Sequence, residues 1–298
     1  MSAPTAINNR YGAALLVAAA SLFTLDVTLL RFLSPDVPFT QIIFFRSACQ
    51  LVIVALWIGA RQPALFRSTR WPKLVLRGLT SLLCWWLYYA SFQRLELALA
   101  STLTFTTSLF VVAMAPLVLG EKISVWRWLT TGAGFIGVII ASKITGLNIE
   151  LGVLFGLGSA FAAAILIFQN RVLARTEHTA TIMFWIGLVA TSGTMPMAIV
   201  SWTGLSPIDV LLLVTASTLA TVGMLLTVEA YRFGEVSALA TFPYLRILFA
   251  IGIGYFVFAE IAAPREWIGA TIIIICGLLA NERRRPVLPQ EKPLGINH

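Results

Sequence analysis

The chain has 298 residues, of which 58% are hydrophobic and only 11% are charged, with a mean hydropathy of +0.88. A soluble domain of this length could not cover its surface with so few charges, because soluble proteins use about 25% charged residues. The apolar residues form blocks of about 20, which is the length of a helix that crosses a bilayer core of roughly 30 Å. The short strands of alternating apolar and polar residues that build an outer-membrane barrel are not seen. The composition therefore predicts an all-α integral membrane protein whose surroundings are a lipid bilayer.

Ten apolar blocks follow one another along the chain, separated by short connections with turn-forming residues. The predicted spans are residues 12–33, 39–59, 72–92, 98–119, 126–144, 151–172, 180–202, 207–231, 236–259 and 266–281. The first block is too long for the apolar region of a signal peptide, so it is expected to be the first span. The predicted organisation is a cytoplasmic N-terminus at 1–11, a first half at 12–144, a second half at 151–281 and a disordered cytoplasmic tail at 282–298.

The basic residues give the ten spans an orientation. Lys and Arg concentrate in the cytoplasmic loops of membrane proteins. With the N-terminus inside, the cytoplasmic segments carry fifteen of the 21 Lys and Arg residues, the opposite side carries four, and Arg46 and Arg246 fall within spans. Nine or eleven spans would scramble this bias. The net charge of +8 is thus a topology signal, and we expect no nucleic-acid partner.

The potential metal-binding and redox residues are few and scattered. Cys49, Cys84 and Cys276 lie singly in apolar blocks, while His178 and His298 lie at a span edge and at the chain end. Buried packing cysteines and solvated histidines are the simpler interpretation, so we expect neither a metal site nor a cofactor. No P-loop motif is present, which argues against ATP-driven pumping by this chain.

The two halves of the sequence resemble each other. At a shift of 139 residues, 96–141 aligns with 235–280 without a gap and with nine identities, Glu121/Glu260 and Trp128/Trp267 among them. At a shift of 140, Arg31 coincides with Arg171. Because each half has five spans, the second half must enter the membrane upside down. Inverted repeats with a substrate site between them are a recurring transporter architecture that provides alternating access.

Each half also ends its fourth span in a Gly-Glu or Ala-Glu turn, Gly120–Glu121 and Ala259–Glu260, before a fifth span that carries a tryptophan. In this the chain resembles the EamA-type drug/metabolite transporter superfamily over about residues 10–281, and most of all the ten-helix aromatic amino-acid exporters of bacteria. The resemblance implies an exporter of small organic solutes in the bacterial inner membrane. The chain departs from a symmetric pattern at Pro243, whose counterpart in the first half is Thr104.

A solute pathway requires a helix face less apolar than lipid would favour, and spans three, four and nine provide such faces. The candidate pathway residues are aromatic or carry a hydroxyl: Ser81, Trp85, Tyr88, Tyr89, Thr102, Phe105, Thr106, Thr241 and Tyr244. Pockets that are mostly apolar with a few polar groups suit an amphiphilic or aromatic solute. The alternative is an aromatic belt at the outer boundary for the tyrosines, and local packing for the rest.

Charges inside the membrane are costly and usually functional. Asp26 and Arg46 both lie ~10 Å below the outer boundary, at about 1.5 Å per residue, so we expect them to meet as an ion pair, either a structural clamp or a gate or proton site. Arg246 lies near the midplane. It could bind a substrate carboxylate or pair with Glu229 by snorkelling. Pro243 frees a carbonyl within span nine and makes this span the preferred moving element.

The leading hypothesis is a secondary carrier that exports small organic solutes, amino acids including aromatic ones, by alternating access. The alternatives on the same fold are an importer or exchanger of phosphorylated metabolites and a multidrug exporter. A membrane-embedded enzyme would need clustered catalytic groups at membrane depth, and no catalytic residue is assigned. A channel would need a selectivity filter, which the sequence does not show. Nothing in the sequence requires an oligomer, so a monomer is the starting expectation.

Overall fold

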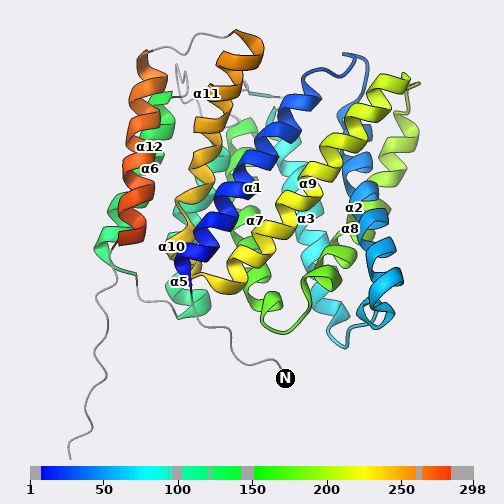
Figure 1. The fold of residues 1–298 in the computed structure, drawn as a ribbon, viewed down its shortest axis with the longest axis horizontal. Helices are drawn as coiled ribbons and strands as arrows, with labels where there is room; N and C mark the ends of the chain where they lie inside the picture. Colours follow the sequence, from blue (N-terminus) through cyan, green and yellow to red (C-terminus); the bar gives the residue numbers. More distant parts are fainter. Residues whose placement is uncertain are drawn as a thin grey trace, which may run out of the picture.

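The computed structural model describes residues 8–92, 94–95, 103–120, 123–141, 151–259 and 264–282. All regular structure in these ranges is helical, and the helices stand side by side as a bundle (Figure 1). The elements are, in chain order, α1 (Asn9–Leu30), α2 (Phe39–Arg61), η1 (Pro63–Phe66), α3 (Trp71–Phe92), α5 (Thr107–Leu119), α6 (Val125–Ala141), α7 (Leu151–Ala174), α8 (Thr179–Val200), α9 (Pro207–Phe233), α10 (Val236–Leu239), η2 (Phe242–Tyr244), α11 (Leu245–Phe258) and α12 (Pro264–Glu282).

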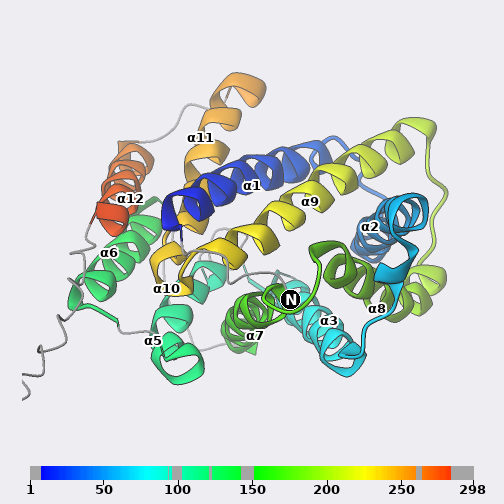
Figure 2. The ribbon, with the colours of Figure 1, turned by 60° about the horizontal axis from the view of Figure 1, so that its bottom comes forward.

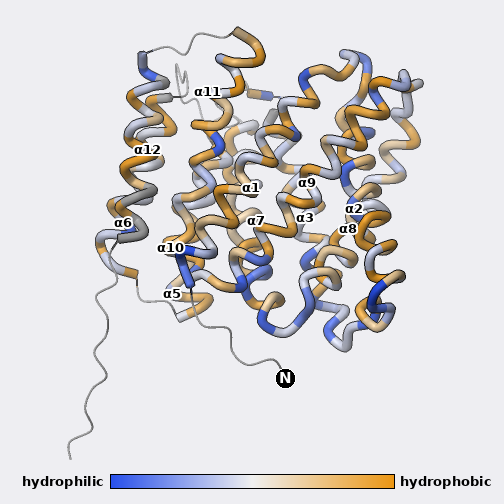
Figure 3. The backbone as a smooth tube through the Cα atoms, in the orientation of Figure 1, coloured by the Kyte–Doolittle hydropathy of each residue, from blue (hydrophilic) through white to orange (hydrophobic). Residues whose placement is uncertain are grey.

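The helices match the predicted membrane spans. By length and composition, α1, α2, α7, α8, α9 and the segment Val236–Phe258 could each cross a bilayer. Three shorter apolar helices, Leu103–Leu119, Val125–Ile140 and Trp267–Cys276, join them. With α3, the described part of the chain has ten helical segments at the places of the ten predicted spans. Apolar residues cover the helices, while hydrophilic ones gather toward the two ends of the bundle (Figure 3).

Helix boundaries differ from the prediction by a few residues. The first helix begins at Asn9 rather than at residue 12, because the side chain of Asn8 accepts a hydrogen bond from the backbone N–H of Tyr11 and caps the helix. The start of the predicted fourth span, the end of the fifth and the tail beyond residue 282 lie outside the described residues.

The two halves run in opposite directions through the bundle. α1 begins and α12 ends at one end, which we call the closed end; α1 and α11 end at the other, the open end (Figure 1). The backbone N–H of Asn8 donates to the carbonyl of Phe233, and Arg171 also bonds to the last turn of α9. The start of α1 and the end of α7 therefore lie at the same end, so these corresponding helices are antiparallel and the repeats are inverted.

Helix packing repeats when the halves are exchanged. In the repeat, α7 is the counterpart of α1, and α9 is the counterpart of α3. α1 packs along α9, and in the same way α3 packs along α7 (Figure 2). The two remaining pairs join equivalent helices to each other, α2 to α8 and α6 to α12. Each helix contact between the halves is thus matched by an equivalent contact when the halves are exchanged, as the sequence repeat predicts.

The fourth and ninth spans are both interrupted at corresponding depths. The ninth stops at Leu239, passes through η2, which has Pro243 in its first turn, and resumes as α11. Proline has no N–H to donate and clashes with the preceding turn, so the continuous helix predicted over 236–259 is broken here. In the first half the helical turn at 103–105 ends at Thr106, whose hydroxyl donates to the carbonyl of Leu103 at 2.6 Å.

The same two spans end alike. Gly120 closes α5 with φ 65°, and Ala259 closes α11 with φ 53°. These residues are 139 positions apart and occupy equivalent places in the repeats. Within the described residues Ala259 is the one non-glycine residue with a positive φ. The repeat therefore preserves a left-handed helix end even where the second half lacks the glycine that favours it.

Candidate functional site

A cavity of about 450 Å³ opens between the two halves at the open end of the bundle. One face of α1, the end of α3, the interrupted start of the fourth span and one face of α11 form its walls. The lining residues are Thr24, Val27, Thr28, Arg31, Tyr88, Thr104, Phe105, Arg246, Ile247, Ala250, Ile253, Gly254 and Phe258. The cavity thus combines aromatic rings, threonine hydroxyls and two arginines, and its described lining contains no Asp or Glu.

Beside the cavity, an ion pair and a second arginine lie close to one aromatic ring. A guanidinium nitrogen of Arg46 lies 2.8 Å from a carboxylate oxygen of Asp26, whose side chain is 2% exposed, so the ion pair expected from their depths is present. The guanidinium carbons of Arg46 and Arg246 lie 5.9 Å and 5.5 Å from the centre of the Phe23 ring. Asp26 balances one of the two arginines, and the group keeps a net positive charge.

Arg246 is the arginine of this group that faces the cavity. It projects from α11 and is exposed to the cavity space, which Tyr88 also lines. The alternative pairing with Glu229 is wrong, because Glu229 contacts Arg232 at 3.4 Å and accepts a hydrogen bond from the Thr179 hydroxyl at the closed end. Arg246 is therefore available to a ligand in the cavity.

The floor of the cavity is an aromatic pair. Phe105 and Tyr244 pack edge to face with ring centres 5.8 Å apart, and Tyr244 is 1% exposed. Below them lies a small apolar void of about 40 Å³, which Thr104 and Phe105 also line and which Pro243 and Tyr231 close. Phe105, which lines both spaces and packs on Tyr244, therefore lies between the open cavity and this void.

The closed end is sealed by charged and backbone contacts. Arg127 of α6 reaches Glu235 at 2.5 Å and donates to the Ser237 hydroxyl at 2.6 Å. Arg171 of α7 donates to the carbonyls of Tyr231 and Arg232 at 2.7 Å and 2.6 Å. Beside these contacts, apolar residues of α1, α5, α7, α9 and α10 form a buried cluster. The cavity therefore communicates with one side of the bundle only.

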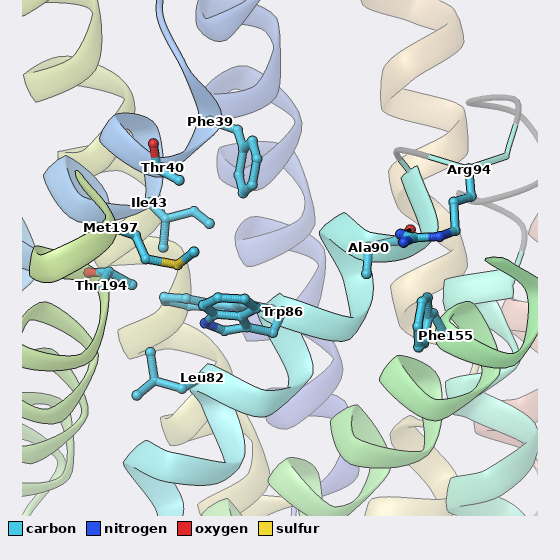
Figure 4. A pocket seen from close by; sticks show the side chains of 11 residues that line it. Phe39, Thr40, Ile43, Leu82, Trp86, Ala90, Arg94, Phe155, Thr194 and Met197 are labelled. Carbon is cyan, nitrogen blue, oxygen red and sulfur yellow. Dashed lines mark hydrogen bonds between the residues drawn. The ribbon is translucent and has the colours of Figure 1, made fainter. Parts of the chain in front are cut away.

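A second cavity of about 320 Å³ lies between α2, α3 and α8, with Phe155 of α7 at its edge (Figure 4). Its walls are mostly apolar and include Trp85, Trp86 and Met197. Arg94 lies at its rim, where its guanidinium carbon is 5.1 Å from the centre of the Phe155 ring. This cavity is separate in its lining from the one between the halves.

The predicted pathway residues divide among several places. Tyr88, Phe105 and Arg246 line the cavity between the halves. Tyr244, Thr241 and Thr106 are buried at or below its floor. Trp85 lines the second cavity instead. Two further residues can be placed elsewhere: Ser81 is buried and accepts a hydrogen bond from Arg77, and Pro243 lines the small void. Thr102 and the side chain of Tyr89 lie outside the described residues.

The polar face of α1 is the part of the lining that sequence reasoning missed. Thr24, Thr28 and Arg31 recur at i, i+4 and i+7 and therefore share one face of an otherwise apolar helix. This spacing is visible in the sequence and could have identified the polar face of α1. The cavity face of α11 gave no such signal, because apart from Arg246 it consists of residues such as Ile247 and Ala250 that are equally suited to lipid.

Comparison with protein families gives one match that covers nearly the whole chain. The model described as "EamA-like transporter family" matches residues 10–143 and again residues 150–281. The two matches correspond to the two inverted halves of the bundle. A solved crystal structure superposes on this fold with a TM-score of 0.78 over 91% of this chain and 96% of that chain, at 14% sequence identity.

Curated relatives are transporters with different solutes. The pseudopaline exporter CntI of Pseudomonas aeruginosa is 25% identical over 92% of this chain and 97% of its own length. The S-adenosylmethionine uptake transporter of Rickettsia prowazekii is 23% identical over 78% and 80%. The riboflavin transporter of Vibrio cholerae is 24% identical over 80% and 81%. Transport is shared among these relatives, whereas the solute and its direction are not.

Proposed function

Because the chain belongs to the EamA-like transporter family, we propose that this small-solute transporter exports amino acids, aromatic ones included, by alternating access of its two inverted halves. The cavity between the halves would be the substrate site in its outward-open form. With the orientation expected from the basic residues, the closed end faces the cytoplasm and the protein resides in the inner membrane of a bacterium.

The position of Arg246 is the observation that carries this proposal. Its guanidinium faces the cavity, where the described lining has no acidic residue. A guanidinium binds a carboxylate through two parallel hydrogen bonds, more strongly than it binds a neutral acceptor. The rings of Tyr88 and Phe105 on the same walls would contact an apolar side chain, and the hydroxyls of Thr24 and Thr28 could accept from an α-amino group.

Transport by the purified protein in liposomes tests the proposal. We expect labelled phenylalanine and threonine to equilibrate across the membrane faster than in protein-free liposomes. Robust movement of a sugar phosphate without any movement of an amino acid would reject the amino-acid assignment in favour of a phosphorylated solute, which two arginines on the cavity wall could also attract.

The role of Arg246 is tested with substrate analogues. In Arg246→Ala, transport of phenylalanine should fall at least about tenfold, because a hydrogen bond to a charged group contributes roughly 1.5–3 kcal/mol. Transport of phenethylamine, which lacks the carboxylate, should fall much less, and Arg246→Lys should retain part of the activity. Arg94→Ala, at the rim of the second cavity, is the matched control. Equal losses for both compounds would assign Arg246 a structural role.

A further inference from the structure

Two arginines at equivalent positions of the repeats have opposite surroundings. Arg31 follows the last turn of α1, and Arg171 lies near the end of α7, its counterpart 140 positions later. Arg31 is exposed at the mouth of the cavity, whereas Arg171 is buried with 3% of its surface exposed. Since the repeats are otherwise alike in their packing, this contrast marks how the two ends of the bundle differ.

At the closed end, Arg171 joins two helices of the second half. One of its terminal nitrogens donates to the carbonyls of Tyr231 and Arg232 in the last turn of α9. Carbonyls in the last turn of a helix have no partner within the helix, and they carry the negative end of its dipole. The buried guanidinium donates hydrogen bonds to these carbonyls, and its positive charge balances the negative end of the dipole. α7 and α9 consequently pack against each other beside this contact.

At the open end, the corresponding helices are apart. The counterparts of α7 and α9 are α1 and α3, which make no comparable contact among the described residues. The cavity lies between them instead, with Arg31 on one wall and Tyr88 of α3 on another. The guanidinium carbon of Arg31 lies 4.6 Å from the centre of the Phe258 ring of α11. In the last turn of α3, the corresponding helix end, the carbonyl of Ala90 accepts from the Arg94 guanidinium and the carbonyl of Ser91 accepts from the backbone N–H groups of Arg94 and Leu95, each at 3.0 Å.

We propose that Arg31 and Arg171 are equivalent latches used in turn during transport. Arg171 holds α7 to the end of α9 and keeps the closed end shut. When the halves exchange conformations, Arg171 releases the end of α9. Arg31 then leaves its present contacts, the ring of Phe258 among them, and replaces Arg94 as the donor to the last-turn carbonyls of α3, which shuts the open end. This inference rests on the proposed alternating access, but it concerns the protein's conformation and is independent of which solute is carried.

Thiol labelling of the purified protein tests the latches without any substrate. The three native cysteines are replaced by alanine, and a reporter is introduced either at the open end, Ile253→Cys, or at the closed end, Ala240→Cys. Ile253 lines the cavity and Ala240 is 2% exposed. Arg171→Ala should slow labelling of the first reporter and speed labelling of the second, so that the ratio of the two rates changes by about tenfold or more, because one hydrogen bond to a charged group shifts an equilibrium by roughly that factor.

The decisive step adds Arg31→Ala to the Arg171→Ala protein. Loss of the second latch should shift the ratio of the two labelling rates back by about tenfold, while Arg31→Lys, which keeps a donor, should shift it back less. Arg265→Ala, at the start of α12, is the matched control and should change nothing. If Arg31→Ala leaves the Arg171→Ala rates unchanged or lowers the open-end rate further, the latch role of Arg31 is excluded. Should Arg171→Ala fail to fold, Arg171→Gln removes the charge while filling the space.

This experiment and the transport assay fail separately. If labelling follows the expected pattern but the protein moves no amino acid, the latch proposal stands and only the amino-acid assignment is rejected. If the protein transports amino acids but neither arginine substitution changes the labelling rates, the proposed function stands and the latch proposal is rejected.

Discussion

Phe105 and Tyr244 occupy equivalent positions in the two inverted halves, and their rings pack against each other at the floor of the cavity. One residue from each repeat thus meets its own counterpart, as expected of residues close to the axis that relates the halves. The contact lies where spans four and nine are interrupted, so the helices can change direction there without breaking a continuous hydrogen-bond ladder. This pair is therefore the natural barrier between the cavity and the closed end.

We expect the two rings to be energetically coupled. In a double-mutant cycle with Phe105→Ala and Tyr244→Ala, the coupling free energy of unfolding should be about 0.5–1.5 kcal/mol, the value of an aromatic pair beyond its buried area. Tyr244→Phe keeps the ring and should preserve the coupling. Thermal unfolding of the detergent-purified variants measures it, and strictly additive effects of the two alanine substitutions would show that the rings act independently.

The ion pair between Asp26 and Arg46 should stabilise the fold. Asp26→Asn leaves a guanidinium without its counter-charge and should lower the free energy of unfolding by about 2 kcal/mol, less than for a fully buried pair because Arg46 is 28% exposed. Adding Arg46→Gln should recover part of the loss. Asp36→Asn, in an exposed connection, is the control with no expected effect. The midpoint of thermal unfolding measures the loss and the recovery. If Asp26→Asn does not change this midpoint, the ion pair is not a structural clamp.

The left-handed helix ends predict opposite effects for two complementary substitutions. Ala259→Gly should stabilise the protein by about 0.5–1 kcal/mol, since a left-handed conformation costs an L-residue roughly 1–2 kcal/mol and the extra freedom of unfolded glycine offsets part of it. Gly120→Ala should destabilise it by about 1 kcal/mol through strain alone, because a Cβ at Gly120 would meet no atom within 4 Å. Unfolding midpoints that shift in the same direction would contradict this account.

The contact between Arg127 and Glu235 predicts a charge-reversal effect at the closed end. Glu235→Gln should increase thiol labelling of Ala240→Cys severalfold, because a partly exposed ion pair contributes up to about 1 kcal/mol, or roughly a factor of five. The double exchange Arg127→Glu with Glu235→Arg should return the labelling rate toward that of the parent protein. A rate that stays high in the exchanged protein would assign the opening to lost packing and not to lost charge.

The sequence by itself determined the architecture, because the physical constraints on a membrane protein are visible in one dimension. Bilayer thickness sets the length of each apolar block, and the matching Glu and Trp positions at a constant shift imply the inverted repeat. The depth of Asp26 and Arg46 in their spans was enough to anticipate their ion pair, since helix rise converts residue number into depth.

Tertiary structure alone decided which residues face the cavity and which end is shut. Helix rotation about its axis leaves no trace in an apolar sequence, so Trp85 could not be distinguished from Tyr88, although they line different cavities. The partners of Glu229 and Arg246 depended equally on how distant helices meet. Above all, equivalent sequence positions imply equal environments, yet Arg31 is exposed and Arg171 buried. A single conformation of a two-state carrier must break the symmetry that its sequence contains.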